Sequence, residues 1–181
     1  MEQNGVKIKR DIVISSFNTI DYYEFGKDFY QMPDAHSCWE MVYVDKGEII
    51  ANYDGIGHTL AQGQAVFHKP GISHSHISNK LVSNNMLVIS FASDSESLNF
   101  FIRKIFTLSK ASVKILSLFL EECKSTFGDI SGKDGNPKKL TVKNTAEGSL
   151  QLMECYFVEF LYSLIRSDSS RSLLRTSNSR E

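Results

Sequence analysis

The hexapeptide WEMVYV, which begins at Trp39, is apolar on both faces when it is drawn as a strand. Side chains alternate between the two faces of a strand, so Trp39, Met41 and Tyr43 would lie on one side and Val42 and Val44 on the other. A sheet with one face in water normally alternates apolar with polar residues. Both faces of this strand must therefore be covered, which predicts a barrel or sandwich with further elements packed outside it.

Up to residue 92 the chain consists of short strand-like runs, such as QAVFH and MLVISF, separated by turn signals. Turns at intervals of about ten residues are typical of an all-β sandwich or barrel. The DKG turn predicts a hairpin between the runs at 39–44 and 48–53, with Gly47 at the position that needs special backbone geometry. We therefore expect a β-barrel over residues 1–92 and not a parallel α/β fold.

After residue 92 the hydrophobic period becomes helical. SDSE at residues 93–96 has the form of a capping box and predicts a first helix. Apolar residues at 3-4 spacing predict further helices over 109–127 and 148–166. The polar, turn-rich residues 128–147 are expected to be a mobile loop. The expected fold is thus mainly β with C-terminal helices (α+β), in which residues 93–167 pack on the barrel as part of one structural unit.

The last of these helices is apolar over far more than one stripe. Such a helix needs cover on both sides, either from the barrel alone or also from a second copy of the chain. We expect a homodimer, because identical patches most often pair about a two-fold axis. The stripe expected to form the dimer interface consists of Leu150, Met153, Phe157, Phe160, Leu161 and Leu164.

Charge and composition exclude several classes of function. The formal net charge is −1 and the pI is near 6.5, so the chain carries no basic footprint for nucleic acid. The sequence shows neither the apolar segment of a secretory signal nor a stretch near the ~18 apolar residues of a membrane span. Three scattered cysteines without a CxxC pair argue against a disulfide framework or a cysteine zinc site. These features predict a cytoplasmic protein.

A first polar cluster stands at the start of the WEMVYV strand. His36, Cys38 and Glu40 would share one strand face with Val42. The apolar residues after Glu40 place that face indoors, and a buried carboxylate requires a partner. We therefore expect His36, Cys38, Glu40 and Val42 to contact a ligand inside the barrel. The alternative is a water-exposed pair of His36 and Glu40 at the start of the strand.

A second polar cluster, HKPGISHSH, contains a Pro-Gly turn. The turn aims His74 at the same barrel mouth, and His76 shares its face, so both join the expected ligand-binding residues. His68 is expected to be a structural strand residue, and His58 is expected to be exposed near a turn. No G-x-S-x-G, P-loop or Rossmann glycine pattern is present, so we assign no catalytic residue and do not expect an enzyme.

The two clusters together resemble the two sequence motifs of the cupin superfamily, whose fold is a jelly-roll barrel. The first reads H-x3-E-x6-G in HSCWEMVYVDKG, and the second reads L-x2-G-x3-F-x2-PG-x2-H up to His74. With MLVISFASDSESLNFF and the helix pair joined by a polar loop, residues 10–166 are similar to the N-terminal effector-binding domain of AraC/XylS-type transcription regulators. This resemblance implies a cupin-like double-stranded β-helix that binds a small-molecule effector and dimerises.

The same resemblance implies that DNA is bound only through helix-turn-helix units, which these 181 residues lack. Residues 168–181 would then be a disordered tail or a linker toward such units.

The resemblance implies that the metal sites of metal-binding cupins consist of three histidines and one glutamate. Their first motif begins H-x-H, and in this chain Asp34 stands at the position of the first histidine. His36, Glu40 and His74, with Asp34 as a replacement ligand, are the residues that would hold a divalent metal. AraC-type sensor domains resemble metal-free pockets, so no cofactor is expected. Two alternatives stay open: a metal-dependent cupin enzyme of the isomerase or dioxygenase type, and a purely structural dimerisation module whose barrel is filled.

Overall fold

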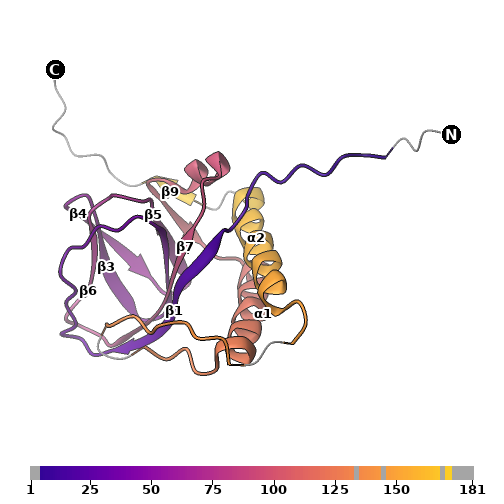
Figure 1. Cartoon of the computed structure of the whole chain (residues 1–181). Coiled ribbons are helices and arrows are strands. Elements are labelled where there is room, and N and C mark those ends of the chain that lie inside the picture. The colour runs from indigo at the N-terminus through magenta and orange to yellow at the C-terminus, as the bar shows by residue number, and fades with distance from the viewer. Residues whose placement is uncertain (1–4, 133–134, 144–145, 168–169, 173–181) are drawn as a thin grey trace, which may run out of the picture.

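The computed structural model describes residues 5–132, 135–143, 146–167 and 170–172 (Figure 1). Its strands are β1 (Ser16–Phe25), β2 (Trp39–Lys46), β3 (Glu48–Tyr53), β4 (Ile56–Ala61), β5 (Gln64–His68), β6 (His74–Ser78), β7 (Asn84–Ala92), β8 (Lys104–Thr107) and β9 (Ser170–Ser172). Its helices are the short 3-10 helix η1 (Glu96–Phe101) and the long α-helices α1 (Lys110–Phe127) and α2 (Ser149–Ser167).

The strands form two antiparallel sheets that face one another. One sheet has six strands in the order β1-β7-β2-β5-β8-β9, and the other has three strands in the order β4-β3-β6. The two sheets enclose a barrel, and α1 and α2 stand on one side of it (Figure 1). This is the mainly β fold with C-terminal helices that the strand and helix patterns predict.

The predicted hairpin between β2 and β3 is wrong. β2 pairs with β5 and β7, whereas β3 pairs with β4 and β6, so the chain crosses from one sheet to the other at Gly47. Gly47 does adopt a positive φ of 76°, and a Cβ there would collide with the backbone oxygen of Ser83. Only glycine fits this close approach, so the special geometry was correctly placed but serves a corner of the barrel.

β2 is buried on both faces, as its sequence predicts. Trp39, Met41 and Tyr43 belong to an outer core between the six-stranded sheet and the helices. Val42 and Val44 belong to an inner core inside the barrel. β2 therefore separates the two cores, and its inner face carries the predicted site.

The first predicted helix does not form as an α-helix. Residues 96–101 form η1, and residues 104–107 form β8, which pairs with β5. Ile105 and Phe106 are buried in the inner and outer cores respectively, which is the alternation of a strand. The Ser93 hydroxyl caps no helix and donates to the N-terminal segment instead. The open edge of β5 and burial in two cores thus outweigh the local helical pattern.

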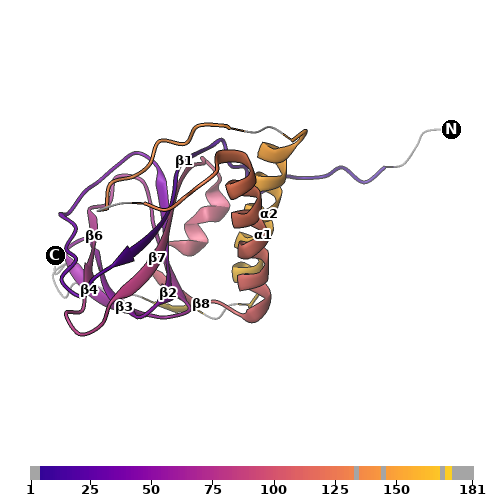
Figure 2. The same cartoon turned by 90° about the horizontal axis from the view of Figure 1, so that it is seen from below.

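The two long helices match their predicted ranges closely and cover the outer face of the six-stranded sheet (Figure 2). α1 begins after Ser109, whose side chain accepts a hydrogen bond of 3.1 Å from the Ser112 backbone N–H. This N-cap interaction satisfies one of the free donors at the start of the helix. Both helices contribute an apolar stripe to the outer core.

The stripe of α2 that was predicted to form a dimer interface faces the barrel. Five of its six residues have no exposed surface within one chain: Met153, Phe157, Phe160, Leu161 and Leu164. The ring of Phe157 lies edge-on to Phe91 of β7, with 5.0 Å between centroids. Leu150 alone is open, at 53% exposure. Because a fully covered side chain has no surface to offer a second copy, these five residues are internal packing, and only Leu150 of the predicted interface stripe remains open to a partner.

The segment from 128 to 147, expected to be mobile, is tied to β1 over its described residues; we call these the strap. The Gly132 backbone N–H donates to the Tyr22 carbonyl at 2.9 Å. The Lys138 backbone N–H donates to the buried carboxylate of Asp21 at 3.1 Å. The strap therefore joins α1 to α2 while it lies along the barrel.

The predicted tail of residues 168–181 falls largely outside the described residues. Within it, Ser170–Ser172 form β9, which pairs with β8 at the edge of the six-stranded sheet. Three polar residues carry no strand signal of their own, so this element follows from the available backbone of β8 and not from its sequence.

Candidate functional site

A cavity of about 310 Å³ lies at the predicted site. Its wall includes four of the six predicted ligand-binding residues, namely His36, Cys38, Glu40 and His76. Further polar side chains of the wall, which the sequence did not single out for this role, include Asn18, Gln31 and Ser90. The strap also contributes, through Gly135 and Pro137.

The other two predicted residues lie nearby without lining this cavity. Val42 packs in the inner core. His74, on β6, is buried against Glu40 and borders a separate cavity of about 240 Å³. His36, Glu40, His74 and His76 are therefore brought together from β2, from the segment before it and from the opposite sheet.

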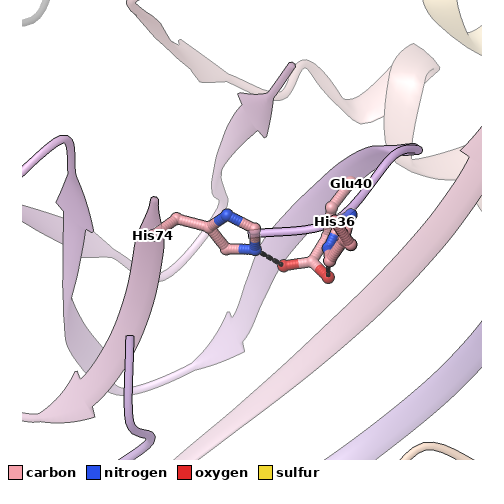
Figure 3. Close-up of side chains that lie close together, drawn as sticks. All are labelled: His36, Glu40 and His74. Carbon is pink, nitrogen blue, oxygen red and sulfur yellow. Dashed lines mark hydrogen bonds and ion pairs between the residues drawn. The ribbon is translucent and has the colours of Figure 1, made fainter. Parts of the chain in front are cut away.

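Glu40 is the centre of this cluster (Figure 3). One carboxylate oxygen, Oε2, lies 3.3 Å from His36 Nε2, and the other, Oε1, lies 3.2 Å from His74 Nε2. The Ser90 hydroxyl also donates to Oε2 at 3.3 Å. The contact with His74 has ion-pair distance but lacks the direction of a good hydrogen bond. Each oxygen of one buried carboxylate thus faces a different imidazole.

The outer ring nitrogens fix how these imidazoles are oriented. His36 Nδ1 lies 3.1 Å from the Cys38 carbonyl, and His74 Nδ1 lies 2.8 Å from the Ile72 carbonyl. A carbonyl oxygen only accepts, so His74 Nδ1 carries a hydrogen, whereas His36 Nδ1 also lies 3.2 Å from Cys38 Sγ, which can donate to it. His74 Nε2 then meets the carboxylate favourably only if it is protonated too, or if a cation lies between them.

Charge and burial act on the pKa values in opposite directions here. Burial favours the neutral form of Glu40, but the hydrogen bond from His36 and the close contact with His74 outweigh burial and hold the pKa of Glu40 well below its usual range. The hydrogen bond to Glu40 raises the pKa of His36. Burial lowers the pKa of His74, but Glu40 outweighs burial and raises it overall. The cluster therefore stabilises an anionic carboxylate between cationic imidazoles.

A second pair of histidines lies deeper. His68 Nε2 and His76 Nε2 are 3.1 Å apart, and both side chains are buried. Burial lowers the pKa of His76 to about 4 and that of His68 well below its usual range. This pair is therefore neutral at pH 7, whereas the pKa values of His36 and His74 are shifted in the opposite direction.

One histidine prediction was incomplete and another is wrong. His68 is the buried strand residue that the sequence predicts, and the strand register also places it directly opposite Glu40. His68 follows Val66 by two residues and therefore lies on the same strand face. Because Val66 is buried in the inner core, this spacing was the signal that His68 points into the barrel. His58 was expected to be exposed, but it is 7% exposed because it shares the buried face of β4 with Leu60.

Within the part of the chain that the structure describes, two sets of side chains could hold a metal ion. One is the predicted His36, Glu40 and His74; the other is Glu40, His68 and His76, and within each set the ligand atoms lie within 4.8 Å of one another. Imidazole and carboxylate groups suit zinc and other divalent transition metals. Asp34, the predicted replacement ligand, borders the cavity, but its Oδ1 accepts from the Ala35 N–H at 2.7 Å.

Known proteins resemble this chain in structure only. No protein-family model matches the sequence, and no curated protein matches it significantly. An RmlC-like cupin from Shewanella frigidimarina is 19% identical, over 44% of this chain and 72% of that one, with a TM-score of 0.37. An RmlC-like cupin with a double-stranded β-helix fold from Methanocaldococcus jannaschii is 15% identical, over 55% and 98%, with a TM-score of 0.40.

A third similar structure is a DMSP lyase from Ruegeria pomeroyi, which is 23% identical over 42% of this chain and 38% of that one, with a TM-score of 0.36. Identities this low concern the fold alone. The observed strand order makes the fold a cupin-type double-stranded β-helix, as predicted. The cupin fold alone does not assign the chain to the AraC-type regulators.

The expectation that the chain is not an enzyme is wrong. Among the structures that resemble this chain is one named as a lyase, so the fold gives no ground for excluding catalysis. The absence of familiar catalytic motifs was too weak a signal, because cupin sites are built from residues scattered over strands. Within the described residues, no helix is both long enough and apolar enough to cross a membrane.

Proposed function

We propose that this chain is the small-molecule sensing and dimerisation part of an AraC-type transcription regulator, in which helix-turn-helix units elsewhere would bind DNA. The motif resemblance over residues 10–166 supports this proposal, together with the cupin barrel and the two long helices packed on it. The effector would occupy the cavity beside Glu40.

The observation that carries the proposal is the double contact of the strap. Gly135 and Pro137 line the cavity, and the strap that contains them connects α1 to α2. A ligand in the cavity would touch the barrel and this connection at once. If it binds one arrangement of the helices more tightly than another, it shifts the equilibrium between them, which is what a sensor requires.

The chemistry of the wall indicates the class of effector. The wall carries two carboxylates, Asp34 and Glu40, and amides at Asn18 and Gln31. No lysine or arginine stands among its described residues, and the imidazole of His36 in this wall is already paired with Glu40. Carboxylates repel anions and accept hydrogen bonds from hydroxyl or amino groups. A neutral polyhydroxyl compound or a small cation therefore fits better than a carboxylic acid.

A ligand panel tests the sensing proposal. Metal-free protein is heated with neutral sugars and polyols, small amines, and small carboxylic acids, and the melting temperature is recorded. We expect a concentration-dependent rise from a polyol or an amine, weakened by Asn18→Leu in the cavity wall and unchanged by Asn99→Leu on η1. No rise from any class would overturn the proposal.

A second candidate function, a metal-dependent cupin enzyme, is favoured by the tethered Nδ1 atoms of His36 and His74. Metal-bound histidines usually donate their other ring N–H to a carbonyl or carboxylate, as His74 does and as His36 can. A metal held by His36, Glu40 and His74 would act as a Lewis acid on a substrate oxygen. Elemental analysis of protein purified without added metal decides: stoichiometric metal that is lost in His74→Gln supports this candidate, and substoichiometric metal unaffected by His74→Gln rejects it.

A further inference from the structure

The contact between His68 and His76 is not used by the proposed sensor, although His76 borders its cavity. His68 closes β5 in the six-stranded sheet, and His76 stands in β6 of the three-stranded sheet, so their rings meet across the barrel. Neither ring is open to solvent. Burying two imidazoles costs free energy unless their nitrogens find partners.

When hydrogens are assigned to the ring nitrogens of His68 and His76, one buried nitrogen is left without a hydrogen-bond partner among the described residues. His76 Nδ1 lies 2.8 Å from Gln31 Oε1, so it carries the hydrogen, and in the neutral ring Nε2 is a bare lone pair. That lone pair points at His68 Nε2, 3.1 Å away. If His68 Nε2 donates to it, His68 Nδ1 becomes a bare lone pair that is buried, and no hydrogen-bond partner reaches it among the described residues.

The alternative is that both Nε2 lone pairs point at a cation. Metal–nitrogen bonds of about 2.0–2.1 Å at a tetrahedral ion place two ligand nitrogens roughly 3.3 Å apart. The observed 3.1 Å is close to that separation. A carboxylate oxygen of Glu40 lies within 4.8 Å of a ring nitrogen of each histidine and supplies negative charge. Gln31 holds the His76 ring from behind, as an outer partner of a metal ligand does.

We propose that Glu40, His68 and His76 bind a divalent transition metal of the zinc class, through the two Nε2 atoms and one carboxylate oxygen. Two imidazoles and one carboxylate favour zinc, cobalt, nickel or copper over magnesium or calcium. His76 and Glu40 both border the 310 Å³ cavity, so a fourth coordination position would open toward it. This inference goes beyond the sensing proposal and does not depend on it.

This set differs from the predicted one in what its nitrogens already contact. The Nε2 atoms of His36 and His74 each face an oxygen of Glu40. Among the described residues, the Nε2 atoms of His68 and His76 have only each other as a hydrogen-bonding partner. A metal between His68 and His76 would therefore give both nitrogens a partner, while it shares the Glu40 carboxylate with His36 and His74.

The test is a titration of chelator-treated full-length protein with Zn²⁺ and with Co²⁺, followed by calorimetry and by visible absorption of the cobalt form. We expect one ion per chain and the intense cobalt bands of a site with nitrogen ligands. His68→Gln and His76→Gln should each abolish saturable binding. His58→Gln, a matched change at a buried histidine outside the cluster, should leave the affinity unchanged.

Gln31→Leu provides a test that does not disturb the buried histidines. It should weaken metal affinity roughly 10–100-fold, the usual effect of losing an outer partner of a metal ligand, while Gln151→Leu on exposed α2 surface should not. The proposal is overturned if neither ion binds saturably. It is also overturned if His36→Gln or His74→Gln abolishes binding that His68→Gln and Gln31→Leu leave intact. The ligand panel on metal-free protein reports on sensing separately.

Discussion

Glu40 determines the electrostatics of the site at the scale of single residues. It is a buried carboxylate that contacts His36, His74 and Ser90 and lies near His68 and His76. Removing one partner from a buried ion pair costs much more than the pair contributes, because a charge is left without compensation. Substitution of Glu40 should therefore have a large and pH-dependent effect.

We expect Glu40→Gln to destabilise metal-free protein by about 3 kcal/mol near pH 5.5. The pKa of Glu40 is depressed, so its contribution is complete above its ordinary pKa of 4.5 and is lost as the pH falls. The pKa values of His36 and His74 are raised, so their contribution is complete below 6.5 and is lost as the pH rises. The difference between wild type and variant should therefore be largest between these values.

Urea unfolding of both proteins with a chelator, from pH 4 to pH 9, measures this difference. Glu159→Gln, on exposed α2 surface, is the matched control and should show no maximum. A difference that stays constant with pH would contradict the assigned charges.

At the scale of elements, α2 is held by the sheet that it covers and not by a second chain. Phe157 contacts Phe91 of β7, Phe17 of β1 and Phe119 of α1. Its burial is complete within one chain. Its energetic role is therefore that of a core residue.

Phe157→Ala should lower the free energy of unfolding by about 3–5 kcal/mol, because it removes a large side chain and leaves a cavity. Glu159→Ala, on the exposed face of the same helix, should change it by less than about 0.5 kcal/mol. Chemical denaturation measures both. If Phe157→Ala instead produced a stable monomer from a dimer, the packing described for α2 would be incorrect.

The strap can be tested at its closest approach to the barrel. A Cβ at Gly132 would collide with the ring of Tyr23, whereas a Cβ at Gly26 would meet nothing within 4 Å. Gly132→Ala should therefore cost about 1–3 kcal/mol, as overpacking does, and Gly26→Ala should cost much less. Thermal unfolding compares them, and equal effects would show that the strap does not lie against β1.

Particular residues show how much of this structure the sequence could predict. The alternation of side chains in β2 and the 3-4 spacing of apolar residues in α1 and α2 indicate which faces are buried. The barrel, both long helices and the convergence of His36, Glu40 and His74 could therefore be predicted from the sequence. Residues 93–108 were assigned wrongly, because pairing with β5 is a long-range effect. His68 was undervalued for the same reason, since its place opposite Glu40 depends on strand register.

At the scale of the whole molecule, the barrel forms one layer and the helices α1 and α2 form a second layer beside it (Figure 2). The strap connects the two helices and lies along the barrel. The proposed homodimer must use surface that these layers leave open. Leu150 and Leu152 are the exposed apolar residues of α2. A second copy would cover them by two-fold pairing.

Leu152→Glu should convert the proposed dimer to a monomer, because pairing about a two-fold axis would bring two buried carboxylates together. Light scattering coupled to size exclusion measures the mass, and circular dichroism checks that the fold is kept. Gln151→Glu adds the same charge one position away and should leave the mass unchanged. A wild-type mass near 20.4 kDa would reject the dimer itself.

One carboxylate serves two neighbouring imidazole pairs, and this sharing sets up a competition. A guest that draws Glu40 toward His36 and His74 takes negative charge away from His68 and His76, and an ion held by the deeper pair does the reverse. Metal and effector should therefore weaken each other's affinity by the same factor, so that the protein would respond to a given effector concentration differently in metal-rich and metal-poor conditions.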